Sequence, residues 1–173
     1  RQAANVLNTL GVKQQDRVAT LAWNSHRHYE LYFAVSGSGA ILHTVNPRLF
    51  PEQIIYILNH AEDEVLFLDI QFVPLIEAVR DQLPKLKHIV LMVGKDSMPE
   101  SKLDLLCYEE LVEQASKDYE WPSFDENLAA TLCYTSGTTG RPKGVPRIHR
   151  VERAAATAHV AQSGFVRGER SLG

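Results

Sequence analysis

Two kinds of apolar pattern alternate along the first ninety residues of the chain. Short runs rich in β-branched and aliphatic residues recur about every two dozen residues, and segments with apolar residues at helical spacing separate them. The expected strands are residues 17–23, 41–45, 65–68 and 89–93, and the expected helices are residues 2–10, 26–35, 52–59 and 72–83. This alternation predicts repeated βαβ units, and therefore an α/β fold with a parallel sheet and right-handed crossovers.

Residues that favour helix starts stand at the boundaries of these segments. Asn24 and Ser25 offer an N-cap for the second helix, and Pro51 suits the first turn of the third. Between residues 94 and 125 the pattern loosens into polar connections, and only a short helix over residues 108–115 is expected there.

A glycine-rich segment follows the next apolar run. Residues 128–134 predict a buried strand, and residues 134–145 read Tyr-Thr-Ser-Gly-Thr-Thr-Gly-Arg-Pro-Lys-Gly-Val. The glycines let backbone amides approach an anion closely, and successive amides in such turns form concavities that bind phosphate. Four hydroxyl groups add donors, and one lysine adds a mobile positive charge. Because open α/β sheets bind ligands where strands end, the segment predicts a phosphate-binding loop.

The spacing of this segment excludes a Walker A loop. That motif needs a lysine directly after its last glycine and a Ser or Thr next. Here Arg141 and Pro142 separate Gly140 from Lys143, and Gly144 follows the lysine. An ordinary glycine-rich turn is the simpler alternative, but four hydroxyls, three glycines and a lysine exceed what turn chemistry requires.

Residues 135–144 resemble the signature loop of the acyl-adenylate-forming, or AMP-binding, enzymes. This family includes acyl-CoA synthetases, luciferases and the adenylation domains of peptide synthetases, and its loop holds the pyrophosphate part of ATP. The resemblance therefore implies that seven residues contact the nucleotide: Thr135, Ser136, Gly137, Thr138, Thr139, Gly140 and Lys143. It assigns no catalytic residue and no metal ligand to this chain.

The resemblance extends over most of the upstream chain. Residues 16–20, 39–48 and 52–68 are similar to acyl-CoA synthetases that act on medium or longer chains. It implies part of the large N-terminal domain of an AMP-forming acyl-CoA ligase, which activates a carboxylic, typically fatty, acid with ATP as acyl-AMP and transfers the acyl group to CoA. In that family a glutamate of an aromatic-Gly-x-Thr-Glu motif holds Mg²⁺. Neither this motif, nor the ribose-binding Thr-Gly-Asp, nor the late catalytic lysine is found in these 173 residues.

The resemblance fades after the loop. Residues 146–148 stand where relatives usually have a helix-capping Ser or Thr, although His149 and Arg150 match a pair common in the family. The expected division is a partial AMP-binding domain over residues 1–150 and an unmatched tail over residues 151–173, which a shifted reading frame or a joined segment would explain. Residues 153–163 of this tail are compatible with a helix.

Composition narrows the class of protein. A net charge of −3 with 45% hydrophobic residues is typical of a globular protein and argues against a nucleic-acid partner. No apolar run is long enough to span a bilayer. We therefore expect a cytoplasmic protein without a transmembrane segment, and a targeting segment ahead of Arg1 is the open alternative.

The cysteines and histidines suggest no metal site. Cys107 and Cys133 are far apart and are expected to be plain thiols, with Cys133 buried. His26 and His28 are two residues apart on an expected helix, so their side chains should not share a face. Three further histidines are expected on the surface or as hydrogen-bonded core residues: His43, His60 and His88.

Two other classes of function stay open at this stage. A non-catalytic module that binds a nucleotide or phosphate would need the same glycine-rich loop. An inert truncated product would carry the loop without using it.

Overall fold

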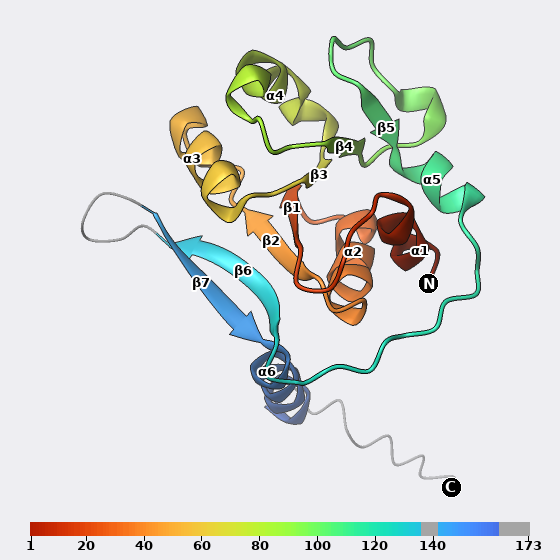
Figure 1. Ribbon diagram of the computed structural model, residues 1–173, viewed down its shortest axis with the longest axis vertical. Coiled ribbons are helices and arrows are strands. Elements are labelled where there is room, and N and C mark those ends of the chain that lie inside the picture. Colours follow the sequence, from red (N-terminus) through yellow and green to blue (C-terminus); the bar gives the residue numbers. More distant parts are fainter. Residues whose placement is uncertain (136–141, 163–173) are drawn as a thin grey trace, which may run out of the picture.

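The computed structural model describes residues 1–135 and 142–162, with side chains up to residue 155. A seven-stranded sheet in the order β5-β4-β3-β1-β2-β6-β7 forms its centre (Figure 1). The strands are β1 (Arg17–Leu21), β2 (Ile41–Val45), β3 (Val65–Leu68), β4 (His88–Leu91), β5 (Leu105–Cys107), β6 (Ala129–Thr135) and β7 (Lys143–Ile148). The helices are α1 (Gln2–Thr9), α2 (His26–Gly37), α3 (Pro51–Ala61), α4 (Val73–Val79), α5 (Tyr108–Gln114) and α6 (His149–Gln162).

The sheet is parallel except at one edge. The pairs from β5 through to β6 are parallel, and β7 runs antiparallel to β6. Strand β1 lies at the centre, with β2 on one side and β3 on the other. The predicted α/β fold with repeated βαβ units is therefore confirmed.

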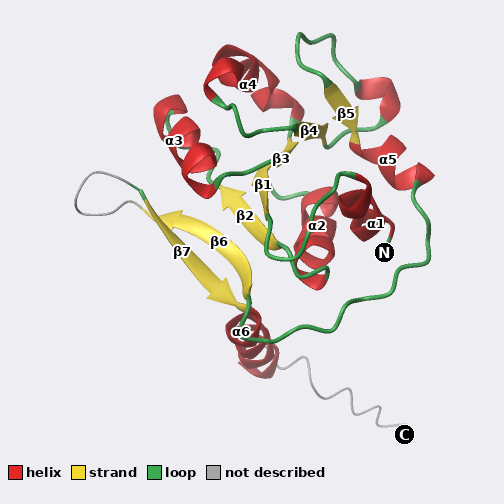
Figure 2. Cartoon of the chain, viewed as in Figure 1, coloured by secondary structure: helices red, strands yellow, loops and turns green. Residues whose placement is uncertain are grey.

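Helices cover both faces of the central strands (Figure 2). Along β3, Leu66 and Leu68 pack with α3 and α4, whereas Val65 and Phe67 pack with α1, α2 and α5. Successive side chains of a strand point to opposite faces, so a strand covered on both sides is apolar throughout. This is why the strands could be recognised as continuous apolar runs.

Local signals placed the helix starts correctly. Ser25 is the N-cap of α2, and its side chain accepts a hydrogen bond of 3.2 Å from the backbone N–H of His28. Pro51 lies in the first turn of α3, where a missing N–H costs nothing.

A long connection joins the two ends of the sheet. It leaves α5 and passes α1 and α2 before it enters β6 (Figure 1). The side-chain amide of Asn5 donates to the carbonyls of Ser116 and Asp118, at 2.8 and 2.9 Å. Trp121 then packs so closely on Gly37 that a Cβ at Gly37 would lie 2.6 Å from the indole ring. The connection is thus fastened to the helices.

Several sequence expectations need correction. The helix expected over residues 72–83 is the shorter α4, with 3₁₀ turns at residues 70–72 and 80–82. Strands β5 and β7 were not expected. Cys133 was expected to be buried but is only half-buried, and Cys107 is the buried thiol. Cys133 lies on β6, beside a cleft of about 660 Å³ between this strand and α2 that leaves the outer strands partly uncovered.

Helix α6 begins within residues 1–150, the expected AMP-binding part, and continues into residues 151–173, the expected tail. Thr131 of β6 donates a hydrogen bond of 3.0 Å to the carboxylate of Glu152, which also lies 3.2 Å from the guanidinium of Arg147. Residues 163–173 lie outside the described residues. The division of the chain at residue 150 stays a prediction.

Candidate functional site

The two ends of the glycine-rich segment lie side by side. Strand β6 ends at Thr135, β7 begins at Lys143, and the two residues are direct partners across the antiparallel pair. Both are exposed. Five of the seven expected nucleotide-contacting residues lie outside the described residues: Ser136, Gly137, Thr138, Thr139 and Gly140. The structure thus brings Thr135 and Lys143 of the predicted site together at the same edge of the sheet.

This edge is the one at which open α/β sheets bind ligands. Strand β6 is parallel to β2, so Thr135 lies at the carboxyl ends of the parallel strands. The connections from β1 to β2 and from β2 to β3 run on opposite faces, so the strand order reverses at β1. A crevice outside the carboxyl ends of the strands is expected at such a switch point.

An aromatic and charged cluster occupies the carboxyl ends of β1 to β3. The backbone N–H of Trp23, just after β1, donates a hydrogen bond of 2.7 Å to the carboxylate of Asp69, just after β3. The guanidinium of Arg48 lies 5.4 Å from the centre of the Trp23 ring, within the range of a cation–π contact. Sequence reasoning missed this cluster. Its position at or just after the ends of three predicted strands was a usable signal.

The residue before the loop is held by two histidines. The ring of Tyr134 lies 5.2 Å from the ring of His43 and 5.8 Å from that of His60. The phenol oxygen and Nδ1 of His60 are 2.7 Å apart. Burial, reinforced by the charge of Asp63, raises the pKa of Tyr134 to about 12, so the phenol is neutral near pH 7 and can donate this hydrogen bond.

Behind Tyr134 lies a buried acid–imidazole pair. Nδ1 of His43 is 2.6 Å from Oδ2 of Asp63, and both side chains are fully buried. Burial raises the pKa of Asp63, against the opposing effect of the hydrogen bond from His43. Among the described side chains, Nε2 of His43 and Oδ1 of Asp63 are buried without a hydrogen-bond partner. Of the histidines expected either on the surface or as hydrogen-bonded core residues, His43 is thus a core residue and His60 is an exposed one.

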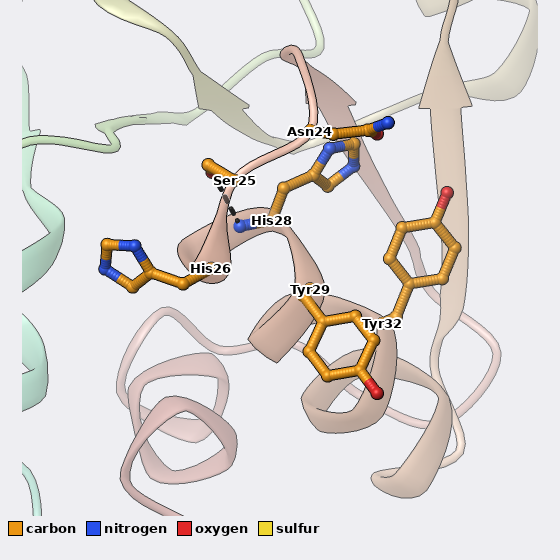
Figure 3. Close-up of a pocket in the computed structure, with 6 residues that line it drawn as sticks. All are labelled: Asn24, Ser25, His26, His28, Tyr29 and Tyr32. Atoms are coloured by element: carbon orange, nitrogen blue, oxygen red, sulfur yellow. Dashed lines mark hydrogen bonds between the residues drawn. The ribbon is translucent and has the colours of Figure 1, made fainter.

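The paired histidines of α2 do not converge on a common point. Figure 3 shows His26 directed away from His28. The ring of His28 is buried, and its nitrogens lie 3.1 Å from the carbonyl of Trp23 and 3.0 Å from the hydroxyl of Thr20. His28 therefore has a structural role. Within residues 1–135 and 142–155, no group of three or more potential ligands is arranged to hold a metal ion.

His149 has a different environment from these pairs. Its ring packs on Phe124 at 4.7 Å, and burial lowers its pKa. Its Nε2 atom is buried without a hydrogen-bond partner among the described residues.

No helix in the described ranges is long and apolar enough to cross a membrane.

Comparisons with known proteins cover most of the chain. The family model of the AMP-binding enzymes matches residues 1–171, and so extends past residue 150. The 3-methylmercaptopropionyl-CoA ligase of Ruegeria lacuscaerulensis is 54% identical over 151 residues, which are 87% of this chain and 28% of that protein. The medium-chain-fatty-acid–CoA ligase of Ectopseudomonas oleovorans is 51% identical over the same shares. The chain thus spans about a quarter of the length of these relatives.

A solved structure supports the same assignment. The anthranilate CoA ligase AuaEII, crystallised with anthranoyl-AMP, superposes with a TM-score of 0.83 at 31% identity, over 90% of this chain and 29% of that one. The structural comparison and the sequence comparisons thus point to the same family of proteins. On these grounds the chain belongs to the AMP-binding enzyme family.

Proposed function

We propose that the protein is an ATP-dependent acyl-CoA ligase. A carboxylate attacks the α-phosphate of ATP, so that an acyl–oxygen–phosphorus link forms and pyrophosphate leaves. The thiol of CoA then attacks the acyl carbon, loses its proton and displaces AMP. The observation that carries the proposal is the pairing of Thr135 with Lys143 at the carboxyl edge of a sheet whose sequence matches the AMP-binding enzymes.

The residues of the loop have a defined role in this scheme. We assign the β- and γ-phosphates to the hydroxyls and amides of Thr135, Ser136, Gly137, Thr138, Thr139 and Gly140. Lys143 offsets the charge that builds up on the leaving pyrophosphate. The chain contributes position and charge, which is how phosphoryl-type chemistry is mainly accelerated.

Mg²⁺ is expected to enter with the nucleotide, where it would neutralise phosphate charge. Because the described part of the chain offers no cluster of metal ligands, no residue of this chain is assigned to the ion.

The proposed acyl substrate is an aliphatic carboxylic acid. Relatives that are 54% and 51% identical bear the names of ligases for 3-methylmercaptopropionate and for medium-chain fatty acids. Both names describe a carboxylic acid with an aliphatic chain. A role in fatty-acid metabolism and a cytoplasmic location are parts of the same proposal.

Carboxylate-dependent exchange between ATP and pyrophosphate tests the proposed first step. The protein at its full encoded length is incubated with ATP, Mg²⁺, labelled pyrophosphate and one acid at a time from short to long chains. We expect label in ATP only when an acid is present, and acyl-CoA after addition of CoA. ATP binding without any exchange would identify a non-catalytic nucleotide-binding module instead.

A further inference from the structure

Tyr134 contacts several elements at the point where the chain enters the glycine-rich segment. It precedes Thr135 on β6, and its phenol oxygen lies 2.7 Å from Nδ1 of His60 on α3. Its ring also contacts the ring of His43 on β2, with 5.2 Å between the centroids. One side chain thus connects the end of β6 to a neighbouring strand and to a helix.

The same ring also lies close to β7. Gly144 is the direct partner of Tyr134 across the two strands, and it follows Lys143. A Cβ atom at Gly144 would lie 3.2 Å from the Cζ atom of Tyr134, which is tighter than ordinary van der Waals contact. The ring therefore lies over the glycine backbone, and the missing side chain of Gly144 makes room for it. An aromatic ring across from a strand glycine compensates for the packing that the glycine lacks.

The support behind the ring is buried. His43 is fixed by its contact of 2.6 Å with Asp63, and neither side chain is accessible to solvent. His60, by contrast, is an exposed residue near the end of α3. The Tyr134 ring is thus packed against the buried His43–Asp63 pair, whereas the Tyr134 hydroxyl contacts His60, which is exposed.

We propose that Tyr134 is a positioning residue for the phosphate site, because its ring and hydroxyl fix the ends of β6 and β7 and so keep Thr135 opposite Lys143. The inference rests on the proposed function, in which these two residues bind the phosphates of ATP. Without the hydrogen bond from the Tyr134 hydroxyl to His60, Thr135 and Lys143 would stay paired across the strands, but their side chains would sample more positions. Precise placement matters because small displacements of a positioned group reduce catalysis strongly.

Removal of the hydroxyl alone is the first test. We expect Tyr134→Phe, in the protein at its full encoded length, to raise KM for ATP in the exchange assay by about three- to tenfold, the usual effect of one lost hydrogen bond. His60→Ala should raise it equally. The double variant should be no worse than either single one, since both remove the same bond.

Conservative and matched variants separate positioning from stability. His60→Asn keeps an acceptor near the place of Nδ1 and should restore most of the ATP affinity lost in His60→Ala. Tyr56→Phe removes a hydroxyl from the same helix, where the ring of Tyr56 lies 5.4 Å from that of His60, and should leave KM for ATP unchanged. Additive losses, absence of rescue by His60→Asn, or an equal effect of Tyr56→Phe would overturn the proposal.

Hydrogen exchange tests the inference independently of the reaction. Amide exchange over residues 143–148 should be faster in Tyr134→Phe and His60→Ala than in Tyr56→Phe, without a change in Tm. Unchanged exchange would contradict the positioning role even if the enzyme is an acyl-CoA ligase. Faster exchange in a protein that shows no ATP–pyrophosphate exchange would support the positioning role and refute the proposed function.

Discussion

At the scale of single residues, the buried pair of His43 and Asp63 is the most consequential arrangement. Burial of an ionisable group is costly unless the group is hydrogen-bonded or paired with an opposite charge. Here His43 and Asp63 are each other's partner, with 2.6 Å between Nδ1 and Oδ2. The arrangement is costly to break but adds little when intact, because desolvation offsets much of the attraction.

The first prediction concerns this pair. Asp63→Ala should lower the free energy of unfolding by about 3–5 kcal/mol, since it leaves the His43 ring buried without its partner. The double variant His43→Leu/Asp63→Leu should lose less than Asp63→Ala, because no polar group is then left unpaired. Urea denaturation of the three proteins measures both differences. A loss below about 1 kcal/mol in Asp63→Ala would show that the pair is not buried as described.

The second prediction is an effect of alkaline pH on stability. The pKa of Tyr134 is raised from 10.0 to about 12, first by burial and then by the charge of Asp63. Between these values the unfolded chain has lost the phenol proton and the folded chain keeps it, so stability falls as the pH rises through this window. Tyr134→Phe removes this contribution. The free energy of unfolding of the wild type should therefore fall relative to that of Tyr134→Phe between pH 10 and pH 12 in denaturation experiments, and a constant difference would contradict the assignment.

Residue type alone predicted part of this chemistry. The sequence left His43 as either a surface or a hydrogen-bonded core residue. Its partner Asp63 lies twenty residues away, and only the packing of α3 on the sheet brings the two side chains together. Cys133 was placed wrongly for a related reason. Its run of apolar neighbours indicates a strand, whereas its exposure depends on the cleft beside α2.

At the scale of elements, α2 and the long connection approach each other closely at Gly37. A Cβ atom on Gly37 would lie 2.6 Å from the Trp121 ring. The end of α2 can therefore approach the connection only through a glycine.

The third prediction compares two glycines. Gly37→Ala should lower the free energy of unfolding by about 1–3 kcal/mol, the usual cost of overpacking, because the Trp121 ring must move. Gly94→Ala is the matched control, since a Cβ there meets no atom within 4 Å. It should change stability by less than about 1 kcal/mol, in the favourable direction. Thermal or urea unfolding measures both, and equal effects would mean that the contact of Gly37 with Trp121 is loose.

The strands and helices were predictable where one physical signal dominated. Buried strands read as apolar runs, and Ser25 and Pro51 marked helix starts. Strand β7 was missed because it is an exposed edge strand that contains Pro146, and proline is tolerated in a sheet only at such edges. Strand β5 has only three residues, too few for any periodicity to show.

At the scale of the whole molecule, the order of the strands decides where ligands bind. Trp23, Arg48 and Asp69 follow parallel strands and so lie at the carboxyl edge, where Thr135 also lies, and the strand order makes β1, β2 and β3 neighbours there. The sequence predicts a phosphate site at one end of this edge because the signature is local, and this site stays a prediction. The sequence could not predict the rest, since that depends on which strands become neighbours.

The fourth prediction is that the 173-residue chain alone forms no acyl-CoA. It spans about 28% of the length of its relatives, and the sequence motifs expected to bind Mg²⁺ and ribose are not found in it. A phosphate loop without these contacts must be ordered at the full entropic cost, so ATP binding should be weak. Purified chain with ATP, Mg²⁺, CoA and a panel of fatty acids tests this. Acyl-CoA formation above that of Lys143→Ala chain would contradict it.

The most direct test of the central claim is the rate of ATP–pyrophosphate exchange in a lysine variant. In the protein at its full encoded length, Lys143→Ala should slow the carboxylate-dependent exchange by one to two orders of magnitude, or about 1.4–3 kcal/mol of transition-state stabilisation. Lys117→Ala, which removes an exposed lysine from the long connection, should exchange at the wild-type rate. Equal rates in wild type and both variants would show that Lys143 does not bind the pyrophosphate, and that the phosphate site lies elsewhere.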